Sequence, residues 1–239
     1  MVAKTVFKRY EFKYKISKEI YEKIIGEIER NLIPDYYGAT TIQSLYFDTD
    51  TNLLIRNSIE KPFYKEKIRA RSYGLIKPSD KVFLELKKKY EKVVYKRRIT
   101  INESEILPFI NGDFTCETQI QKEIRYFCKY YQNLKPSMLI LYDRTAFEDR
   151  YTDLRVTFDK NIRYRTDRLN LHSGLVGTPI LTNGEVMMEV KTSGAFPAWL
   201  IKLLNENKIY KTSFSKYGTA YQLEEDKKRK QSLQKMEAV

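Results

Sequence analysis

The chain has 239 residues, of which 44 are Lys or Arg and 31 are Asp or Glu, giving a formal net charge of +13. This charge, together with a 13% aromatic fraction rich in tyrosine, indicates an anionic partner: nucleic acid, a phosphorylated small molecule, polyphosphate or an acidic membrane surface. A single histidine and two cysteines without C-x-x-C spacing argue against a zinc site or a disulfide framework. With neither a signal peptide nor an apolar run of membrane-spanning length, we expect a cytoplasmic protein.

A series of stretches alternates polar and apolar residues with period two, which is typical of half-buried antiparallel strands. In the stretch KEKIRARSYG, the side chains of Lys67, Arg69 and Arg71 are predicted to point to one face. The predicted strands are residues 8–16, 42–49, 65–74, 82–90, 93–101, 137–147, 154–159 and 186–192.

Helical spacing of apolar residues predicts helices between these strands. Their apolar stripes are Ile20–Ile28, Ile120–Tyr131 and Phe196–Leu203. Ser17 can cap the first helix, and Pro197 suits the first turn of the third. Residues 166–179 are expected to form a loop. With no linker visible, we expect one domain over residues 1–224 and a basic C-terminal tail over 225–239, either solvated or a fraying helix.

The charged faces of the strands allow two interpretations. One is a set of solvated outer faces; the other is the lumen of an antiparallel barrel with the helices packed outside. Arg and Lys recur on strand after strand, whereas solvated faces usually mix Thr, Ser and charges of both signs. We therefore predict an α+β fold with a β-barrel around a basic lumen. Such a lumen needs an anion, and phosphate suits the planar guanidinium best.

Three glutamates lie among these cations at Glu11, Glu85 and Glu189. They could compensate charge, or one could hold Mg²⁺ or Mn²⁺, which typically use one or two carboxylates together with phosphate oxygens. The chain has no G-x-x-x-x-G-K-[ST] sequence, so a P-loop mechanism is excluded.

The motifs RYEFKY, SLYFDT, KIRARSYG, FLELKKK, VYKRR, YDRTAF, LRVTFD, MMEVKT and SFSKYGTAY follow one another along residues 7–221. In this order they resemble the vacuolar transporter chaperone (VTC) domain, the polyphosphate polymerase branch of the CYTH or triphosphate tunnel superfamily. The resemblance implies a triphosphate tunnel fold. It is to the stand-alone catalytic domain of bacterial members, without the SPX and membrane-spanning segments of eukaryotic transporter subunits.

The resemblance also implies roles for individual residues. Those implied to act in catalysis are Arg69, Lys87 and Lys216. Those implied to bind substrate are Lys13, Arg71, Lys96, Tyr142, Arg144, Arg155 and Ser215, with Tyr142 near the nucleobase. Glu189 is implied to bind the metal. Ser213 stands where the family has a further lysine, and Arg9 stands where the related hydrolases have the first Glu of E-x-E-x-K.

The implied activity is metal-dependent transfer of the ATP γ-phosphate onto a growing polyphosphate chain, with Mn²⁺ or Mg²⁺ as cofactor. The expected partners are ATP and polyphosphate, and a membrane protein is compatible with the resemblance. Nucleic acid is disfavoured, because the cations alternate within strands and no RNP-like or helix-turn-helix pattern accompanies them. Two alternatives stay open: a tunnel-type triphosphatase and a non-catalytic polyanion-binding module.

Overall fold

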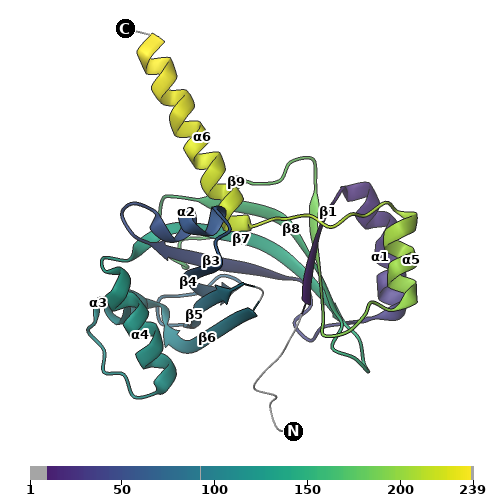
Figure 1. The fold of residues 1–239 in the computed structure, drawn as a ribbon, viewed down its shortest axis with the longest axis horizontal. Helices are drawn as coiled ribbons and strands as arrows, with labels where there is room; N and C mark the ends of the chain where they lie inside the picture. Colours follow the sequence, from purple (N-terminus) through teal and green to yellow (C-terminus); the bar gives the residue numbers. More distant parts are fainter. Residues whose placement is uncertain (1–9, 92, 238–239) are drawn as a thin grey trace. The chain divides into compact units, whose positions relative to one another are not determined.

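The computed structural model describes residues 10–91 and 93–237 and has an α+β architecture (Figure 1). Its strands are β1 (Tyr10–Ile16), β2 (Ile33–Pro34), β3 (Thr40–Asp48), β4 (Tyr64–Tyr73), β5 (Lys81–Tyr90), β6 (Val93–Asn102), β7 (Lys135–Glu148), β8 (Arg155–Arg165), β9 (Thr178–Pro179) and β10 (Val186–Thr192). Its helices are α1 (Lys18–Asn31), α2 (Leu53–Ile59), α3 (Ile106–Asn111), α4 (Gln119–Tyr131), α5 (Ala198–Glu206) and α6 (Lys216–Glu237), with a 3₁₀ turn at Glu103–Glu105.

The predicted elements are present. Every stretch with period-two alternation forms a strand, although Lys8 and Arg9 lie outside the described residues. The three predicted helices are α1, α4 and α5, and the Ser17 hydroxyl caps α1 by accepting a hydrogen bond from Ile20 N at 3.3 Å. The short helices α2 and α3 were not predicted, because one or two turns carry too little periodicity to be recognised.

The strands form one antiparallel sheet in the order β1-β10-β8-β7-β3-β4-β5-β6, with β2 beside β7 and β9 beside β8. The prediction of a closed barrel is met only loosely, because this sheet is open: within the described residues, no pairing joins β1 to β6. The outer edge of β1 is instead covered by an irregular segment. Tyr14 forms a bridge with Lys211, and the Lys13 carbonyl accepts a hydrogen bond from Thr212 N at 2.7 Å.

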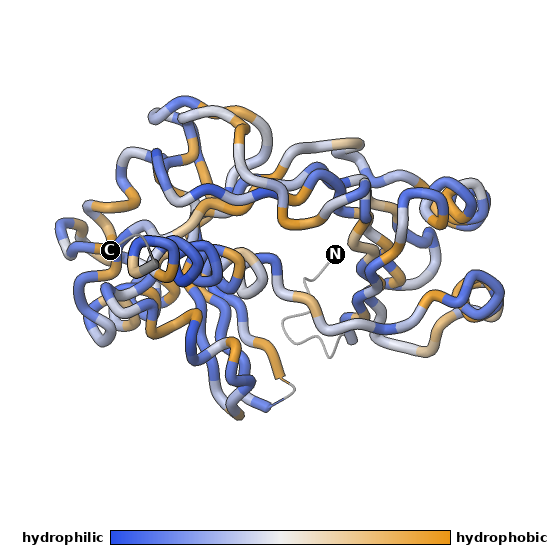
Figure 2. Tube along the Cα trace, turned by 90° about the horizontal axis from the view of Figure 1, so that it is seen from above, coloured by the Kyte–Doolittle hydropathy of each residue, from blue (hydrophilic) through white to orange (hydrophobic). Residues whose placement is uncertain are grey.

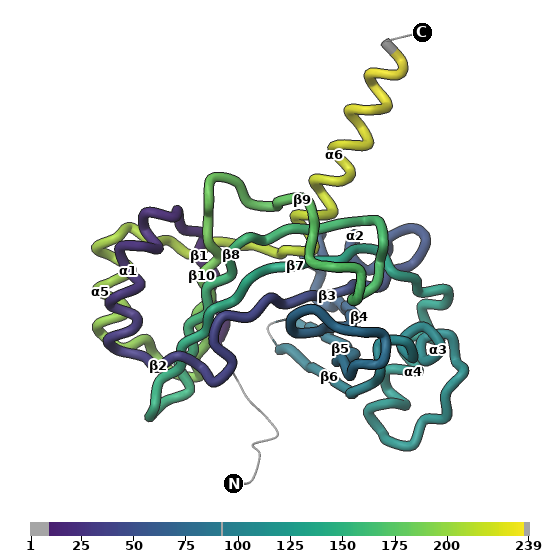
Figure 3. Tube along the Cα trace, turned by 180° about the vertical axis from the view of Figure 1, so that it is seen from behind, coloured from purple at the N-terminus to yellow at the C-terminus, as the bar shows by residue number. Residues whose placement is uncertain are grey.

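The chain divides into two compact units. Unit 1 comprises Met1–Thr41, Tyr142–Ile162 and Leu181–Phe214. In it, α1 and α5 lie side by side and cover the apolar faces of β1, β8 and β10 (Figures 1 and 3). Ile24 of α1 and Leu200 of α5 are fully buried and form part of the helix side of this core. The opposite faces of the same strands carry the polar residues.

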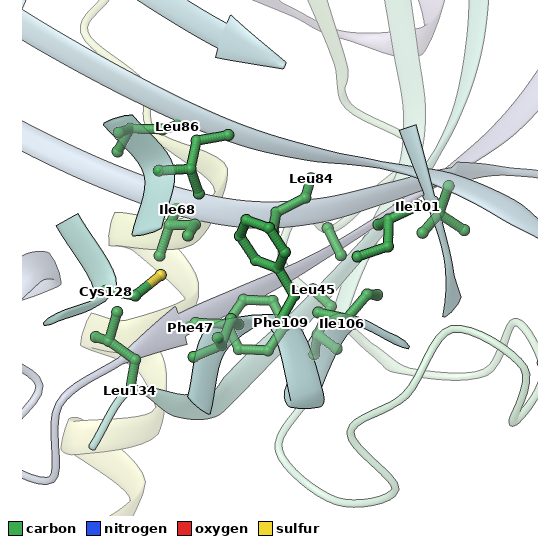
Figure 4. Packing of buried hydrophobic residues seen from close by; sticks show 14 of the residues in the cluster. Leu45, Phe47, Ile68, Leu84, Leu86, Ile101, Ile106, Phe109, Cys128 and Leu134 are labelled. Atoms are coloured by element: carbon green, nitrogen blue, oxygen red, sulfur yellow. The ribbon is translucent and has the colours of Figure 1, made fainter. Parts of the chain in front are cut away.

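Unit 2 comprises Ile42–Leu141, Arg163–Ile180 and Ser215–Val239. Its core lies between α3, α4 and the apolar faces of β3, β4 and β5, as Figure 4 shows for Phe109, Ile68 and Leu84. Ile68 and Leu84 are fully buried. Because strand residues alternate between faces, burying these residues presents Lys67, Arg69 and Glu85 on the other side of the sheet.

The C-terminal region is helical. α6 runs without interruption through position 224, and its later turns are exposed and mostly hydrophilic (Figure 2). The domain boundary at residue 224 stays a prediction. Among the described residues, the structure contains no helix that combines the length and the apolar character needed to cross a membrane.

Candidate functional site

Strand register in unit 2 brings the cations of three strands into neighbouring rows. Arg69 of β4 pairs with Glu85 of β5, which pairs with Arg98 of β6. The next row is formed by Lys67, Lys87 and Lys96. We call this surface the basic face; its cations are Lys67, Arg69, Arg71, Lys87, Lys96 and Arg98. The predicted common direction of Lys67, Arg69 and Arg71 is confirmed, since Ile68 and Ala70 between them are fully buried in the core.

Glu85 organises the basic face. Its side chain is only 1% exposed, and its carboxylate accepts from Arg69 Nε at 2.9 Å, Lys96 Nζ at 2.7 Å and Arg98 Nε at 2.7 Å. Arg71 Nε is 3.9 Å away. Burial alone would raise the pKa of Glu85, but the attraction of Arg69, Arg71 and Lys96 outweighs it and lowers that pKa far below its ordinary range. With four cations around it, Glu85 acts as a counter-ion; this removes it as a metal-ligand candidate.

Two stacked tyrosines lie at the β3 side of the basic face. Tyr46 accepts a hydrogen bond from Arg69 Nη1 at 3.1 Å, and its ring stacks on Tyr217 of α6 with centroids 4.2 Å apart. Sequence reasoning assigned no site role to either tyrosine, or to Arg98. Arg98 could have been found, because it lies two positions after Lys96 on the same strand; the tyrosine pair could not, because its members are far apart in the sequence.

The start of α6 contributes the last predicted residues of unit 2. Ser215 Oγ accepts a hydrogen bond from Gly218 N at 3.2 Å, so this serine caps the helix. Lys67 Nζ lies 3.5 Å from the same Ser215 oxygen and 5.7 Å from the centre of the Tyr217 ring. Lys216 is the first residue of α6. Ser215 is thereby placed beside the basic face, and its predicted contact with phosphate stays a prediction.

In unit 1, two acidic residues and two lysines alternate across the paired strands β1 and β10. Lys13 pairs with Glu189 and Glu11 pairs with Lys191. Lys13 Nζ is 3.3 Å from Glu11 and 3.5 Å from Glu189, and Lys191 Nζ is 3.1 Å from Glu189. Burial would lower the pKa of Lys13, but Glu189 and Glu11 outweigh burial and raise it. We call these four residues the β1–β10 cluster.

The other predicted residues of unit 1 divide between two positions. Arg144 binds Asp159 through two hydrogen bonds, from Nε at 2.6 Å and from Nη2 at 2.7 Å, and its Nη2 is 4.0 Å from Glu189. The Arg144 guanidinium also lies 5.2 Å from the ring centre of Tyr142. These residues adjoin the β1–β10 cluster.

Arg155 is held differently. It binds Asp35, and its Nη1 is 3.5 Å from Glu148. Both partners are carboxylates that sequence reasoning left unassigned. Neither of these carboxylates belongs to the β1–β10 cluster, so the predicted role of Arg155 in binding substrate requires its release from a separate pair of acids.

Comparison with models of known families identifies the family of this chain. The model of the VTC domain matches residues 8–224, which is nearly the whole chain. The protein belongs to the VTC domain family. The resemblance inferred from the sequence motifs is thereby confirmed. No curated protein matches the sequence.

Comparison of this VTC domain with solved structures finds several matches. A candidate adenylate cyclase from Bacillus halodurans is 14% identical, with 86% of this chain and 92% of that chain covered and a TM-score of 0.53. A candidate adenylate cyclase from Vibrio parahaemolyticus is 10% identical over 89% and 97% of the two chains, with a TM-score of 0.45. A conserved hypothetical protein from Pyrococcus furiosus is 12% identical over 84% and 91%, with a TM-score of 0.39. At such identities, the first likeness shows a shared fold alone.

The VTC domain offers a limited donor set for a metal ion. Within the described parts of the chain, no group of three or more His, Cys, Asp or Glu side chains is arranged to hold a metal. Glu11 and Glu189 are two carboxylates that both contact the ammonium groups of Lys13 and Lys191. Two carboxylates suit Mg²⁺ or Mn²⁺ when phosphate oxygens complete the coordination. The residues therefore fit a metal that is bound together with its phosphate substrate.

Proposed function

We propose that this VTC domain is a polyphosphate polymerase that transfers the γ-phosphate of ATP to the end of a polyphosphate chain. The observation that carries the proposal is the basic face, where six cations lie together and four of them surround the buried carboxylate of Glu85. So many like charges repel one another unless a polyanion lies among them. Membership of the VTC domain family supports a phosphate chain as that polyanion.

Phosphoryl transfer requires alignment and charge neutralisation rather than covalent help from the protein. A terminal oxygen of the polyphosphate chain forms a new bond to the γ-phosphorus, the bond from this phosphorus to the β,γ-bridging oxygen breaks, and ADP leaves. The attacking oxygen is already ionised, so no general base is needed. Arg69 and Arg71 hold phosphate oxygens through paired N–H groups, while Lys87, Lys96 and Lys216 add charge.

The metal is proposed to bind at Glu189, with Glu11 beside it. Mn²⁺ or Mg²⁺ would neutralise the charge that develops on the phosphate oxygens. Lys13 and Lys191, which now pair with these carboxylates, would turn their ammonium groups to the phosphates. Arg144 is oriented by Asp159 and supplies a fixed guanidinium next to Glu189.

The proposal is tested by incubating the protein with ATP and Mn²⁺ and then sizing the products. A polymerase yields ADP together with polyphosphate that lengthens with time. Orthophosphate as the main product would identify a triphosphatase instead, because water would then be the nucleophile. Tight polyanion binding with no product at all would leave a binding module.

Polyanions are expected to raise the melting temperature of the protein. Filling the basic face removes repulsion between its cations, and a ligand at a hundred times its dissociation constant adds about 2.7 kcal/mol to stability. For a chain of this size, that corresponds to about 5–10 °C. Thermal melts with inorganic triphosphate, and with sulfate at equal ionic strength, measure the effect. Equal shifts for the two anions would contradict a site built for a phosphate chain.

Arg69→Ala and Arg71→Ala are each expected to lower polymerase turnover by about a hundredfold while the protein stays folded. Folding should survive because Lys96 and Arg98 still pair with Glu85. Arg69→Lys should restore little, because Arg69 donates to Glu85 and Tyr46 from different nitrogens, and one ammonium cannot reproduce that fork. Steady-state rates and melts of the three variants test this; normal turnover in both alanine variants would place these arginines outside the site.

A further inference from the structure

The hydroxyl of Tyr46 has no acceptor for its own proton among the described residues. Tyr46 is only 8% exposed, and its oxygen already accepts a hydrogen bond from Arg69 Nη1 at 3.1 Å. Among the described residues, this is the sole hydrogen bond that the hydroxyl makes. Its own proton therefore has no protein acceptor, and a buried donor without a partner is costly. The arrangement indicates that an acceptor arrives from outside the chain.

The Tyr46 ring is held in place by its neighbours. It stacks on Tyr217 at an interplanar angle of 17°. The Tyr217 hydroxyl donates to the Asp48 carboxylate at 3.1 Å, and Asp48 in turn accepts from the backbone N–H groups of Leu54 and Ile55. A phenol anchored through such a chain of contacts keeps its hydroxyl at one position on the basic face.

The charges around this hydroxyl are mainly positive. β4 contributes Lys67, Arg69 and Arg71, β5 contributes Glu85 behind Arg69, α6 contributes the neutral Tyr217, and β3 itself contributes Asp48. Burial alone would raise the pKa of Tyr46, but Arg69 and Lys67 outweigh it and lower that pKa to about 8. A phenol in such surroundings is a strong hydrogen-bond donor, and its negative form is stabilised only while no other anion occupies the site.

A second hydroxyl on the same face of β3 points to the same kind of ligand. Ser44, two residues before Tyr46, is 1% exposed and pairs in register with Arg71. Its Oγ has no hydrogen-bond partner among the described residues. Two buried hydroxyls without acceptors, each next to an arginine, fit an oxygen-rich anion that accepts from hydroxyl and guanidinium together.

We propose that Tyr46 is a substrate-binding residue whose hydroxyl donates to an oxygen of the phosphate chain held by Lys67 and Arg69, so that binding of the chain requires this hydroxyl to be protonated. The inference rests on the proposed function only in taking a phosphate chain as the ligand of the basic face. It adds a neutral donor to the cations of the basic face, and it links occupancy of the site to proton uptake.

The charges determine whether binding of the phosphate chain takes up or releases a proton at Tyr46. A bound phosphate chain repels a phenolate and accepts from a phenol, so binding raises the pKa of Tyr46 from about 8 towards its ordinary value near 10. Between these values the unliganded protein has lost the Tyr46 proton and the complex has regained it. Affinity for the chain is therefore full at pH 7 and declines as the pH rises above 8.

The test is calorimetric titration of the protein with inorganic triphosphate, in two buffers of different ionisation enthalpy, at pH 7 and at pH 9. In the wild type we expect almost no proton uptake at pH 7 and more than about half a proton at pH 9. Tyr46→Phe keeps the ring and its stacking on Tyr217. We expect it to bind triphosphate about tenfold more weakly at pH 7 and to lose the additional uptake at pH 9.

Two further variants control the experiment. Tyr164→Phe removes a hydroxyl from another buried tyrosine, whose partners are Glu224 and Lys227, and it should behave like the wild type. Ser44→Ala should weaken binding without changing proton uptake, because serine does not ionise in this range. Lys96, whose pKa burial also lowers, contributes the same uptake to all variants and cancels in the comparison.

Unchanged affinity and unchanged proton uptake in Tyr46→Phe, with a melting curve like that of the wild type, would overturn the inference. An absorbance titration of the tyrosines at 295 nm gives a second measurement, because Tyr46→Phe should remove the ionisation near pH 8 and triphosphate should suppress it in the wild type. The outcome is independent of turnover. Proton-linked binding without polyphosphate synthesis would refute the polymerase proposal and retain Tyr46 as a substrate-binding residue. Polyphosphate synthesis without proton-linked binding would retain the polymerase and refute the role of Tyr46.

Discussion

Glu85→Gln is expected to melt well below the wild type and to regain much of the difference when triphosphate is added. The substitution keeps the shape of a side chain that is 1% exposed but removes the negative charge that Arg69, Lys96 and Arg98 surround. Breaking a buried ion pair costs about 3–5 kcal/mol. We expect the lower end, because Lys96 and Arg98 are partly exposed and water screens them. The melting temperature should fall by about 6–12 °C.

The difference in stability between the wild type and Glu85→Gln should depend on pH. The pKa of Glu85 is lowered in the folded state, so its carboxylate stabilises the fold above the ordinary glutamate pKa of about 4.3, and this contribution is lost as the pH falls further towards the folded value. The gap between wild type and Glu85→Gln should be full at pH 7 and narrow below pH 4. Thermal melts across this range measure it.

Glu123→Gln is the matched control. Glu123 pairs with Arg97, which lies between Lys96 and Arg98 on β6 but points to the opposite side, towards α4. Neither side chain of this pair is buried, and the loss of the pair should shift melting by no more than about 1–3 °C, with no response to triphosphate beyond that of the wild type. If Glu85→Gln melted like Glu123→Gln, the cations of the basic face would not depend on their buried carboxylate.

Glu189→Gln is expected to lower polymerase turnover by at least about a hundredfold while triphosphate binding is kept or strengthened. Glutamine cannot supply the charge that the metal needs, so the residual activity should require more Mn²⁺. Lys13 and Lys191, which now lie 3.5 Å and 3.1 Å from the Glu189 carboxylate, would be released from it and would attract phosphate more strongly. Turnover, triphosphate affinity, and Mn²⁺ binding in the presence of triphosphate are the three measurements.

Glu185→Gln controls for the loss of a salt bridge near the same strand pair. Glu185 directly precedes β10 and binds Lys15 at 2.8 Å, outside the β1–β10 cluster. It should retain turnover and the metal requirement of the wild type. Normal turnover and normal Mn²⁺ binding in Glu189→Gln would show that Glu189 is not the metal ligand. Triphosphate binding lost together with activity would instead assign Glu189 to positioning Lys13.

Local patterns were enough to predict much of this protein. Period-two alternation located the strands and correctly placed Lys67, Arg69 and Arg71 on one face, because the direction of a strand side chain depends only on its position in the strand. Helical spacing located α1, α4 and α5 for the same local reason. The ordered motifs predicted the VTC domain family, which the match over residues 8–224 confirms.

Tertiary structure alone decided how the charges are paired. The sequence does not reveal that Glu85 pairs with Arg69 of one neighbouring strand and with Arg98 of the other. This pairing depends on the register between separate strands. Arg155 was grouped with the other cations, yet it binds Asp35, 120 positions away. Such pairs form through long-range folding, and local periodicity carries no information about them.

The same reason explains what sequence reasoning missed at the edges of the sheet and on the basic face. The edge of β1 is covered by Lys211 and Thr212, which a pattern of strands could not reveal, and the sheet is therefore open where a closed barrel was expected. Tyr46 and Tyr217 meet only because α6 returns to β3. Sequence determined which residues are charged and which way each strand presents them; the fold decided which partners each charge meets, because contacts between distant segments arise only when the chain is packed.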